Sequence, residues 1–146
     1  MSDFRKLSDK VLASPQISID DLDEAKARGV TLVVCNRPDG EEEGQLTHAE
    51  IAAAAAGRGM DFVAVPITQS GFSAPQIAAM KSALDRAEGN VLAYCRSGTR
   101  STLLWSLVRS SEGADPAETA AAAAAAGYDV APVRPAMDML AARASG

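Results

Sequence analysis

The chain has few residues that could bind a metal ion or form disulfides. It contains one histidine and two cysteines among 146 residues, which is too few for a standard four-ligand zinc site. Two cysteines also cannot form a disulfide framework, and such low cysteine usage is typical of a protein kept in a reducing cytosol. We therefore predict a cytoplasmic protein with no metal centre and no other cofactor.

Long apolar segments and an excess of positive charge are also absent. No apolar run approaches the roughly 20 residues that are needed to span a bilayer, and residues 1–10 are polar, unlike the start of a secretory signal. Fourteen basic and 19 acidic residues give a net charge of −5. This balance predicts no general attraction for nucleic acid or for an anionic membrane. Any anion-binding site must therefore depend on local positive groups.

Strand and helix signals alternate along the chain. Helical signals follow each of four predicted strands, which cover residues 11–14, 30–35, 61–67 and 90–95. This order predicts an α/β fold in which a four-stranded parallel sheet has helices on both faces. The length fits one domain over residues 1–146. We expect its core over about residues 8–130 and a C-terminal helical tail over residues 131–146.

The loop Cys-Arg-Ser-Gly-Thr-Arg at residues 95–100 lies between a predicted buried strand and a predicted helix. Backbone N–H groups in such a turn form a cradle for an anion, and the start of the helix adds the positive end of its dipole. In such surroundings a cysteine pKa can fall to about 3.5–7.5, which produces a nucleophilic thiolate. We predict that Cys95 and Arg100 are catalytic. The other predicted anion-binding residues of this segment are Arg96, Ser97, Gly98, Thr99 and Ser101.

This loop resembles those of protein tyrosine phosphatases and rhodaneses. Further matching stretches are residues 13–16 (ASPQ), 35–41 (CNRPDGE), 92–101 (LAYCRSGTRS) and 126–129 (AGYD). Together they make the chain resemble a small bacterial family, the beta-lactamase-hydrolase-like phosphatase-like domain, which is also described as a sulfurtransferase family. The resemblance implies a sheet like that of tyrosine phosphatases, with strand order 1-4-2-3.

Two kinds of thiolate chemistry are compatible with the loop. Tyrosine phosphatases typically place five residues between Cys and Arg, whereas this chain places four, the rhodanese length, and Ser101 occupies the phosphatase arginine position. A phosphatase also needs a general acid, but residues 68–74 contain none, and Asp39 is the only substitute. We therefore favour a rhodanese-type sulfurtransferase that forms a persulfide on Cys95. The alternatives are a phosphatase that forms a phosphocysteine, and a non-catalytic module that binds anions or phosphoproteins.

Two further residues are expected near Cys95. Arg37 either adds positive charge at the rim or forms an ion pair within its own acidic loop, in which residues 41–43 are three glutamates expected to be solvated. Cys35 ends the strand that the order 1-4-2-3 places beside the strand of Cys95. It either packs in the core or forms a reversible disulfide with Cys95. His48 is expected to be a surface residue.

The expected ligand is a small sulfur-containing or phosphorylated substrate. In proteins that the chain resembles, this domain can be fused to a metallo-hydrolase-like domain. The resemblance therefore implies a separate partner enzyme in sulfide metabolism, and no nucleic acid or membrane partner is expected.

Overall fold

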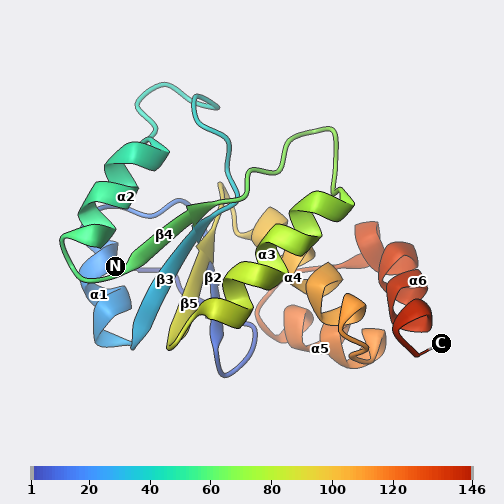
Figure 1. Cartoon of the computed structure of the whole chain (residues 1–146). Helices are drawn as coiled ribbons and strands as arrows, with labels where there is room; N and C mark the ends of the chain where they lie inside the picture. The colour runs from blue at the N-terminus through green and yellow to red at the C-terminus, as the bar shows by residue number, and fades with distance from the viewer. Residues whose placement is uncertain (1, 146) are drawn as a thin grey trace.

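A computed structural model describes residues 2–145, and a five-stranded sheet lies at its centre (Figure 1). The sheet has the order β1-β2-β5-β3-β4. Its strands are β1 (Arg5–Lys6), β2 (Val11–Ser14), β3 (Val30–Cys35), β4 (Asp61–Ala64) and β5 (Asn90–Tyr94). Strands β2, β5, β3 and β4 run parallel to their neighbours. They are the four predicted strands, in the predicted order 1-4-2-3.

The prediction of a purely parallel, four-stranded sheet is wrong in one respect. Strand β1 pairs antiparallel with β2, so the sheet is mixed. The sequence gives no strand signal here because β1 consists of only Arg5 and Lys6. The tight turn after β1 returns the chain, and Leu7 N–H donates to the Val11 carbonyl at 2.9 Å. Strand β4 is also shorter than predicted, ending at Ala64, although the N–H groups of Val65 and Ile67 still donate to the carbonyls of Cys35 and Asn36.

Helices cover both faces of the sheet, as predicted (Figure 1). Helices α1 (Asp21–Ala27) and α2 (His48–Ala56) cover one face. The other face carries α3 (Ala74–Arg86), α4 (Thr99–Ser111), α5 (Pro116–Ala125) and α6 (Arg134–Ser145), with a 3-10 turn over Ala131–Val133. Among residues 2–145, no helix combines the length and apolar character needed to cross a membrane.

Strand β3 lies between β5 and β4 and is buried on both faces of the sheet. Successive side chains of a strand point to opposite faces, so Val33 packs against the α1 and α2 side while Val34 packs against the α3 and α4 side. A continuous apolar sequence therefore suits this position. Parallel pairing with β5 places the carboxyl ends of β3 and β5 side by side, with Cys35 in register with Tyr94.

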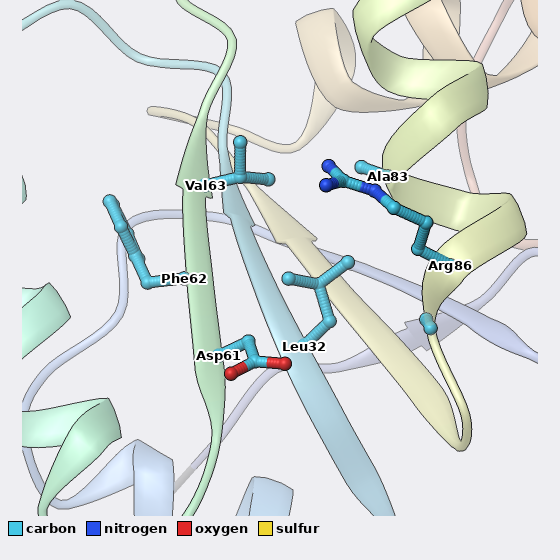
Figure 2. A pocket seen from close by; sticks show the side chains of 7 residues that line it. Leu32, Asp61, Phe62, Val63, Ala83 and Arg86 are labelled. Atoms are coloured by element: carbon cyan, nitrogen blue, oxygen red, sulfur yellow. The ribbon is translucent and has the colours of Figure 1, made fainter.

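Strand β4 forms the opposite edge of the sheet from β1, and a hollow of about 360 Å³ lies between it and α3. Figure 2 shows Val63 and Leu32 on the side of the hollow that faces Arg86, while Phe62 points away from them. The hollow is lined by Leu32, Asp61, Phe62, Val63, Ala83, Arg86 and Ala87. These residues belong to β3, β4 and the C-terminal part of α3, so the hollow is separate from the loop that follows β5.

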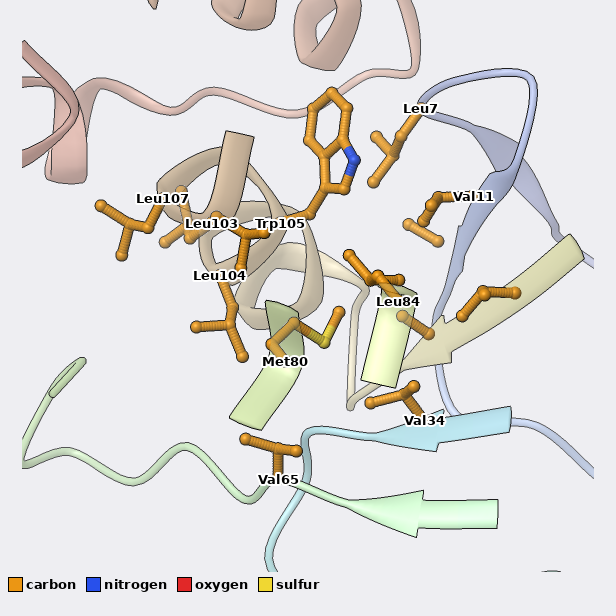
Figure 3. Close-up of a cluster of buried hydrophobic side chains, with 14 of the residues drawn as sticks. Leu7, Val11, Val34, Val65, Met80, Leu84, Leu103, Leu104, Trp105 and Leu107 are labelled. Carbon is orange, nitrogen blue, oxygen red and sulfur yellow. The ribbon is translucent and has the colours of Figure 1, made fainter. Parts of the chain in front are cut away.

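The larger hydrophobic core lies between the sheet and α3 to α6 (Figure 3). Leu104 and Met80 are fully buried at its centre, and Trp105 extends the cluster toward Leu7. Residues after 130, which the sequence places in a tail outside the core, also contribute to it. Met137 of α6 is fully buried in this cluster. The C-terminal helix is thus part of the packing that supports α4.

Replacing Leu104 with alanine should destabilise the fold by about 2–5 kcal/mol, because it leaves a cavity where a fully buried side chain packed. Met139→Ala is the matched control, since Met139 is 52% exposed, and its cost should stay within about 0.5 kcal/mol. Urea denaturation of both variants measures the difference. Equal stabilities for the two would contradict this account of the core.

Candidate active site

The loop after β5 folds back toward its own cysteine. Cys95 is fully buried directly after the strand, and α4 begins four residues later at Thr99. Gly98 precedes that helix with a φ of +94°, a conformation that suits glycine. Its N–H donates to the Cys95 sulfur at 3.1 Å. The loop backbone thus curls around the sulfur, and one of its N–H groups points at it.

Tyr128, from the segment after α5, contacts the loop over residues 95–100. Its hydroxyl donates to the Ser97 carbonyl at 3.1 Å. A Cβ at Gly98 would overlap that hydroxyl, so position 98 needs glycine for space as well as for its φ. The guanidinium of Arg5 lies 5.1 Å from the centroid of the Tyr128 ring and covers it. The sequence includes Tyr128 in a matching stretch but predicts no role for it, because 30 residues separate it from Gly98.

Gly98→Ala should destabilise the protein and abolish anion binding by the loop, for which inorganic phosphate is the probe, because the Cβ meets Tyr128 and the φ is strained. Gly113 is the matched control. Its φ is +93°, but an added Cβ would meet only Ala144, at 3.7 Å. Gly113→Ala should therefore cost about 1 kcal/mol and leave phosphate affinity intact. Denaturation and calorimetric titration measure the two effects, and equal phosphate affinity in both variants would contradict the role given to Gly98.

Arg100, in the first turn of α4, is held by two acceptors. Its Nη1 and Nη2 donate to the two carboxylate oxygens of Glu41, each at 2.8 Å. Nη1 also donates to the Ile67 carbonyl at 2.9 Å. The hydrogen bonds to Glu41 raise the pKa of Arg100, and the nearby Cys95 sulfur raises this pKa further. Arg100 therefore lies beside the candidate nucleophile in a fixed orientation.

Arg37 is a second arginine that binds the Glu41 carboxylate. The Arg37 side chain is only 1% exposed, and its Nε donates to Glu41 Oε1 at 2.9 Å. Its Nη1 donates to Gln16 Oε1 at 3.0 Å, and Nη2 has a longer contact of 3.5 Å with Glu42. Arg37 thus connects the loops that follow β2 and β3. Of the two predicted roles for Arg37, the structure shows the ion pair within the loop.

Glu41 is the functional residue that the sequence prediction misses. The three glutamates at 41–43 were expected to be solvated, but Glu41 joins two arginines, and its pKa is lowered to about 2. The largest cause is the hydrogen bond from Arg100; Arg37 lowers the pKa further, and partial burial opposes both. The spacing of four residues between Arg37 and Glu41 is a weak signal for an ion pair. It could not indicate Arg100, which lies 59 residues further along the chain.

The Glu41 network should make stability depend on pH at the acid end. The folded-state pKa of about 2 lies below the ordinary 4.5, so this carboxylate stabilises the fold above pH 4.5 and ceases to do so as the pH falls toward 2. The stability difference between wild type and Glu41→Gln should be largest near pH 7 and shrink between pH 4.5 and 2. Urea denaturation across this range measures it, with Glu43→Gln as control. A difference that does not vary with pH would rule out this linkage.

Asp39 does not take the position of a general acid. Its carboxylate accepts the backbone N–H of His48 at 2.8 Å and lies 3.5 Å from the His48 ring. The same ring contacts the Arg37 carbonyl at 2.7 Å, so His48 supports the arginine's backbone instead of being a plain surface residue. Asp39 therefore fixes the start of α2. The sequence could not show this, because the loop between residues 39 and 48 determines where the carboxylate points.

Cys35 takes the first of its two predicted roles, packing in the core, and Ser101 is buried near the start of α4. Cys35 packs with Tyr94 and Ile51 on the α1 and α2 side of the sheet, and burial raises the pKa of its thiol. Both cysteines are free and buried in the structure, and the Cys95 sulfur is near enough to act on the pKa of Cys35. The Ser101 hydroxyl is fully buried and forms no hydrogen bond with any of residues 2–145.

An open pocket of about 510 Å³ is lined in part by Arg100. Arg96 stands at its rim with a side chain that is 65% exposed, 3.7 Å from Glu42. The lining residues are Glu41, Thr68, Gln69, Arg96 and Arg100. All of them are polar, and they come from loops after β3, β4 and β5. The pocket thus suits a small, hydrophilic, anionic group.

The family is identified by sequence comparison. Residues 3–112 match the model of the beta-lactamase hydrolase-like protein, phosphatase-like domain. The chain belongs to this family. A beta-lactamase hydrolase-like protein of Agrobacterium fabrum is 31% identical over 108 residues, which cover 74% of this chain and 25% of that protein. The chain therefore spans about a quarter of the length of that relative.

Solved structures of phosphatase-like proteins have a similar fold. A candidate phosphatase from Neisseria meningitidis Z2491 is 33% identical and superimposes with a TM-score of 0.84, covering 96% of this chain and 99% of that one. Tk-PTP in its active form has a TM-score of 0.75 at 21% identity, over 97% of each chain. The chain thus has a tyrosine-phosphatase-like fold, as the resemblance implied. These relatives favour the phosphatase alternative and do not support the preferred prediction of sulfur transfer.

Proposed function

We propose that the protein is a cysteine-dependent phosphatase that hydrolyses small phosphate monoesters. The observation that carries this proposal is the match, over nearly the whole length of both chains, to the candidate phosphatase from N. meningitidis. The site geometry supports it, since a buried cysteine accepts an N–H from Gly98 and lies beside the guanidinium of Arg100. A planar guanidinium matches the oxygens of a phosphoryl group.

The reaction has two steps. The Cys95 thiolate attacks phosphorus, an S–P bond forms, and the P–O bond to the leaving group breaks. Water then attacks the phosphocysteine, the S–P bond breaks, and inorganic phosphate leaves as the thiolate is regenerated. Arg100 and the loop amides stabilise the charge on the phosphoryl oxygens in both steps.

Protonation of the leaving group restricts the substrates. Asp39 is bound to His48, and Glu41 is a carboxylate with a pKa of about 2, so neither can act as a general acid near pH 7. We expect the enzyme to act best on esters whose leaving groups depart as stable anions, such as aryl phosphates. Alkyl phosphates, whose leaving oxygen must be protonated, should react much more slowly.

Sulfur transfer remains a second candidate because of one feature of the loop. Only four residues separate Cys95 from Arg100, and the Gly98 N–H lies 3.1 Å from the sulfur. A tight bowl of this kind suits a single sulfur atom, and sulfite leaves without protonation. The product of this reaction would be a persulfide on Cys95.

A paired assay on one preparation tests the proposal. Wild type should hydrolyse p-nitrophenyl phosphate faster than it transfers sulfur from thiosulfate to cyanide. Cys95→Ser should reduce hydrolysis on the order of 10³-fold or more, because a serine hydroxyl is not ionised at neutral pH. Cys35→Ser is the control and should remain active. Rapid acid quenching and mass spectrometry should detect phosphate on the peptide that contains Cys95.

Two outcomes would overturn the phosphatase proposal. Retained hydrolysis by a folded Cys95→Ser variant would remove Cys95 as nucleophile. Faster sulfur transfer than hydrolysis, with one added sulfur atom on Cys95, would establish the second candidate instead.

A further inference from the structure

The guanidinium of Arg100 is fixed at one end, and the nearby Cys95 sulfur is the one group of the protein that its remaining edge meets among residues 2–145. Arginine has five N–H donors. The Glu41 carboxylate accepts one from each Nη, both at 2.8 Å, and the Ile67 carbonyl accepts the second Nη1 proton at 2.9 Å. The remaining donors, Nε–H and the second Nη2–H, lie together on one edge of the planar group. This edge could bind two oxygens of a tetrahedral anion at once.

These remaining donors lie close to the candidate nucleophile. The Cys95 sulfur is near enough to contribute to the raised pKa of Arg100. The Gly98 N–H points at the same sulfur from within the loop, at 3.1 Å. A group bonded to the Cys95 sulfur would thus lie within reach of both the loop amides and the arginine.

Glu41 is itself held in place by contacts on several sides. Arg37, which is 1% exposed, donates to it at 2.9 Å and is anchored in turn by Gln16 at 3.0 Å. The Glu41 backbone N–H donates to the side chain of Gln45 at 3.1 Å, and Gln45 donates to the Pro38 carbonyl at 2.9 Å. The carboxylate is therefore a fixed part of the site, and displacing it would leave the buried Arg37 without its main partner.

We propose that Glu41 is a positioning residue that orients the Nε–H and Nη2–H edge of Arg100 toward an oxyanion on Cys95. The inference rests on the proposed function and deepens it. A phosphoryl group binds beside Glu41, at the remaining edge of the guanidinium, and does not take the place of the carboxylate. In the opposite arrangement, Glu41 would occupy the anion site and the substrate would have to displace it.

Binding of inorganic phosphate separates the two arrangements. Glu41→Gln should weaken phosphate binding about 10-fold by calorimetry, because a neutral amide cannot accept both N–H groups of the fork. Glu43→Gln is the matched control, since Glu43 lies in the same loop and forms no ion pair within residues 2–145. It should bind phosphate like wild type. Tighter binding by Glu41→Gln would overturn the proposal, because removing a competing carboxylate has that effect.

Side-chain NMR of Arg100 reports its orientation directly. In wild type, the Nη1 and Nη2 signals should be separate, and phosphate should shift the Nε–H signal while the Nη signals stay resolved. In Glu41→Gln, the Nη signals should merge, because rotation of the guanidinium is no longer hindered. A phosphate-induced loss of the separate Nη signals in wild type would show displacement of Glu41 and overturn the proposal.

Kinetics with p-nitrophenyl phosphate add a readout that a purely structural role would not change selectively. Glu41→Gln should lower kcat about 10- to 100-fold, more than it raises KM, because the charge on the transferred group is greatest in the transition state. An unchanged kcat would overturn the proposal. If wild type shows no phosphatase activity, the proposed function fails, but phosphate binding and the Arg100 signals still decide the role of Glu41.

Discussion

The Glu41 carboxylate binds two arginines that come from different loops of the sheet edge, Arg37 after β3 and Arg100 in the first turn of α4. Arg37 extends the network to Gln16 after β2, and Arg100 extends it to the Ile67 carbonyl after β4. All four parallel strands therefore contribute a loop to one set of hydrogen bonds. An isolated surface ion pair contributes little. Here Glu41 accepts a fork of two bonds from Arg100 and a third bond from Arg37, whose side chain is 1% exposed, and together these charge-assisted bonds fix the geometry.

The hydrophobic core fixes the position of the loops at the carboxyl ends of the strands. Helix α4 begins directly after the nucleophile loop and is buried along much of its length against α3, the sheet and α6. Because α4 cannot shift without disturbing that core, the position of Arg100 follows from packing far from the pocket. Tyr128 adds a lateral support, since its hydroxyl packs on Gly98 and bonds to the Ser97 carbonyl. A rigid loop is what preorganised binding of an oxyanion requires.

The fold and the loop point to different branches of thiolate chemistry. The fold belongs with tyrosine-phosphatase-like proteins, whereas the four-residue spacing between Cys95 and Arg100 is the rhodanese length. The sheet places a thiolate and an arginine together in either case. Which bond the thiolate attacks depends on the room above the sulfur and on the acids within reach. Asp39 is bound to His48 and Glu41 to two arginines, which is why the proposed reaction favours leaving groups that depart as anions.

The sequence by itself determined the four parallel strands and the loop that joins Cys95 to Arg100, while the strand order was implied by the resemblance to a family. These features depend on local patterns: apolar strand segments, a glycine between a strand and a helix, and the spacing of Cys95, Gly98 and Arg100. They could be predicted because each is encoded within a few residues, or is carried by motifs that resemble a known family.

Only the tertiary structure decided the partners of those residues. Strand β1 has two charged residues and forms only because the turn brings it to β2. Glu41 reaches Arg100 across 59 residues, and Tyr128 reaches Ser97 across 31; no local pattern specifies either contact. Asp39, the predicted acid, points to His48 because the path of its loop sets its direction. Cys35 packs on the side of α1 and α2 because successive side chains of a strand alternate between faces, and its register with Tyr94 fixes which face it takes.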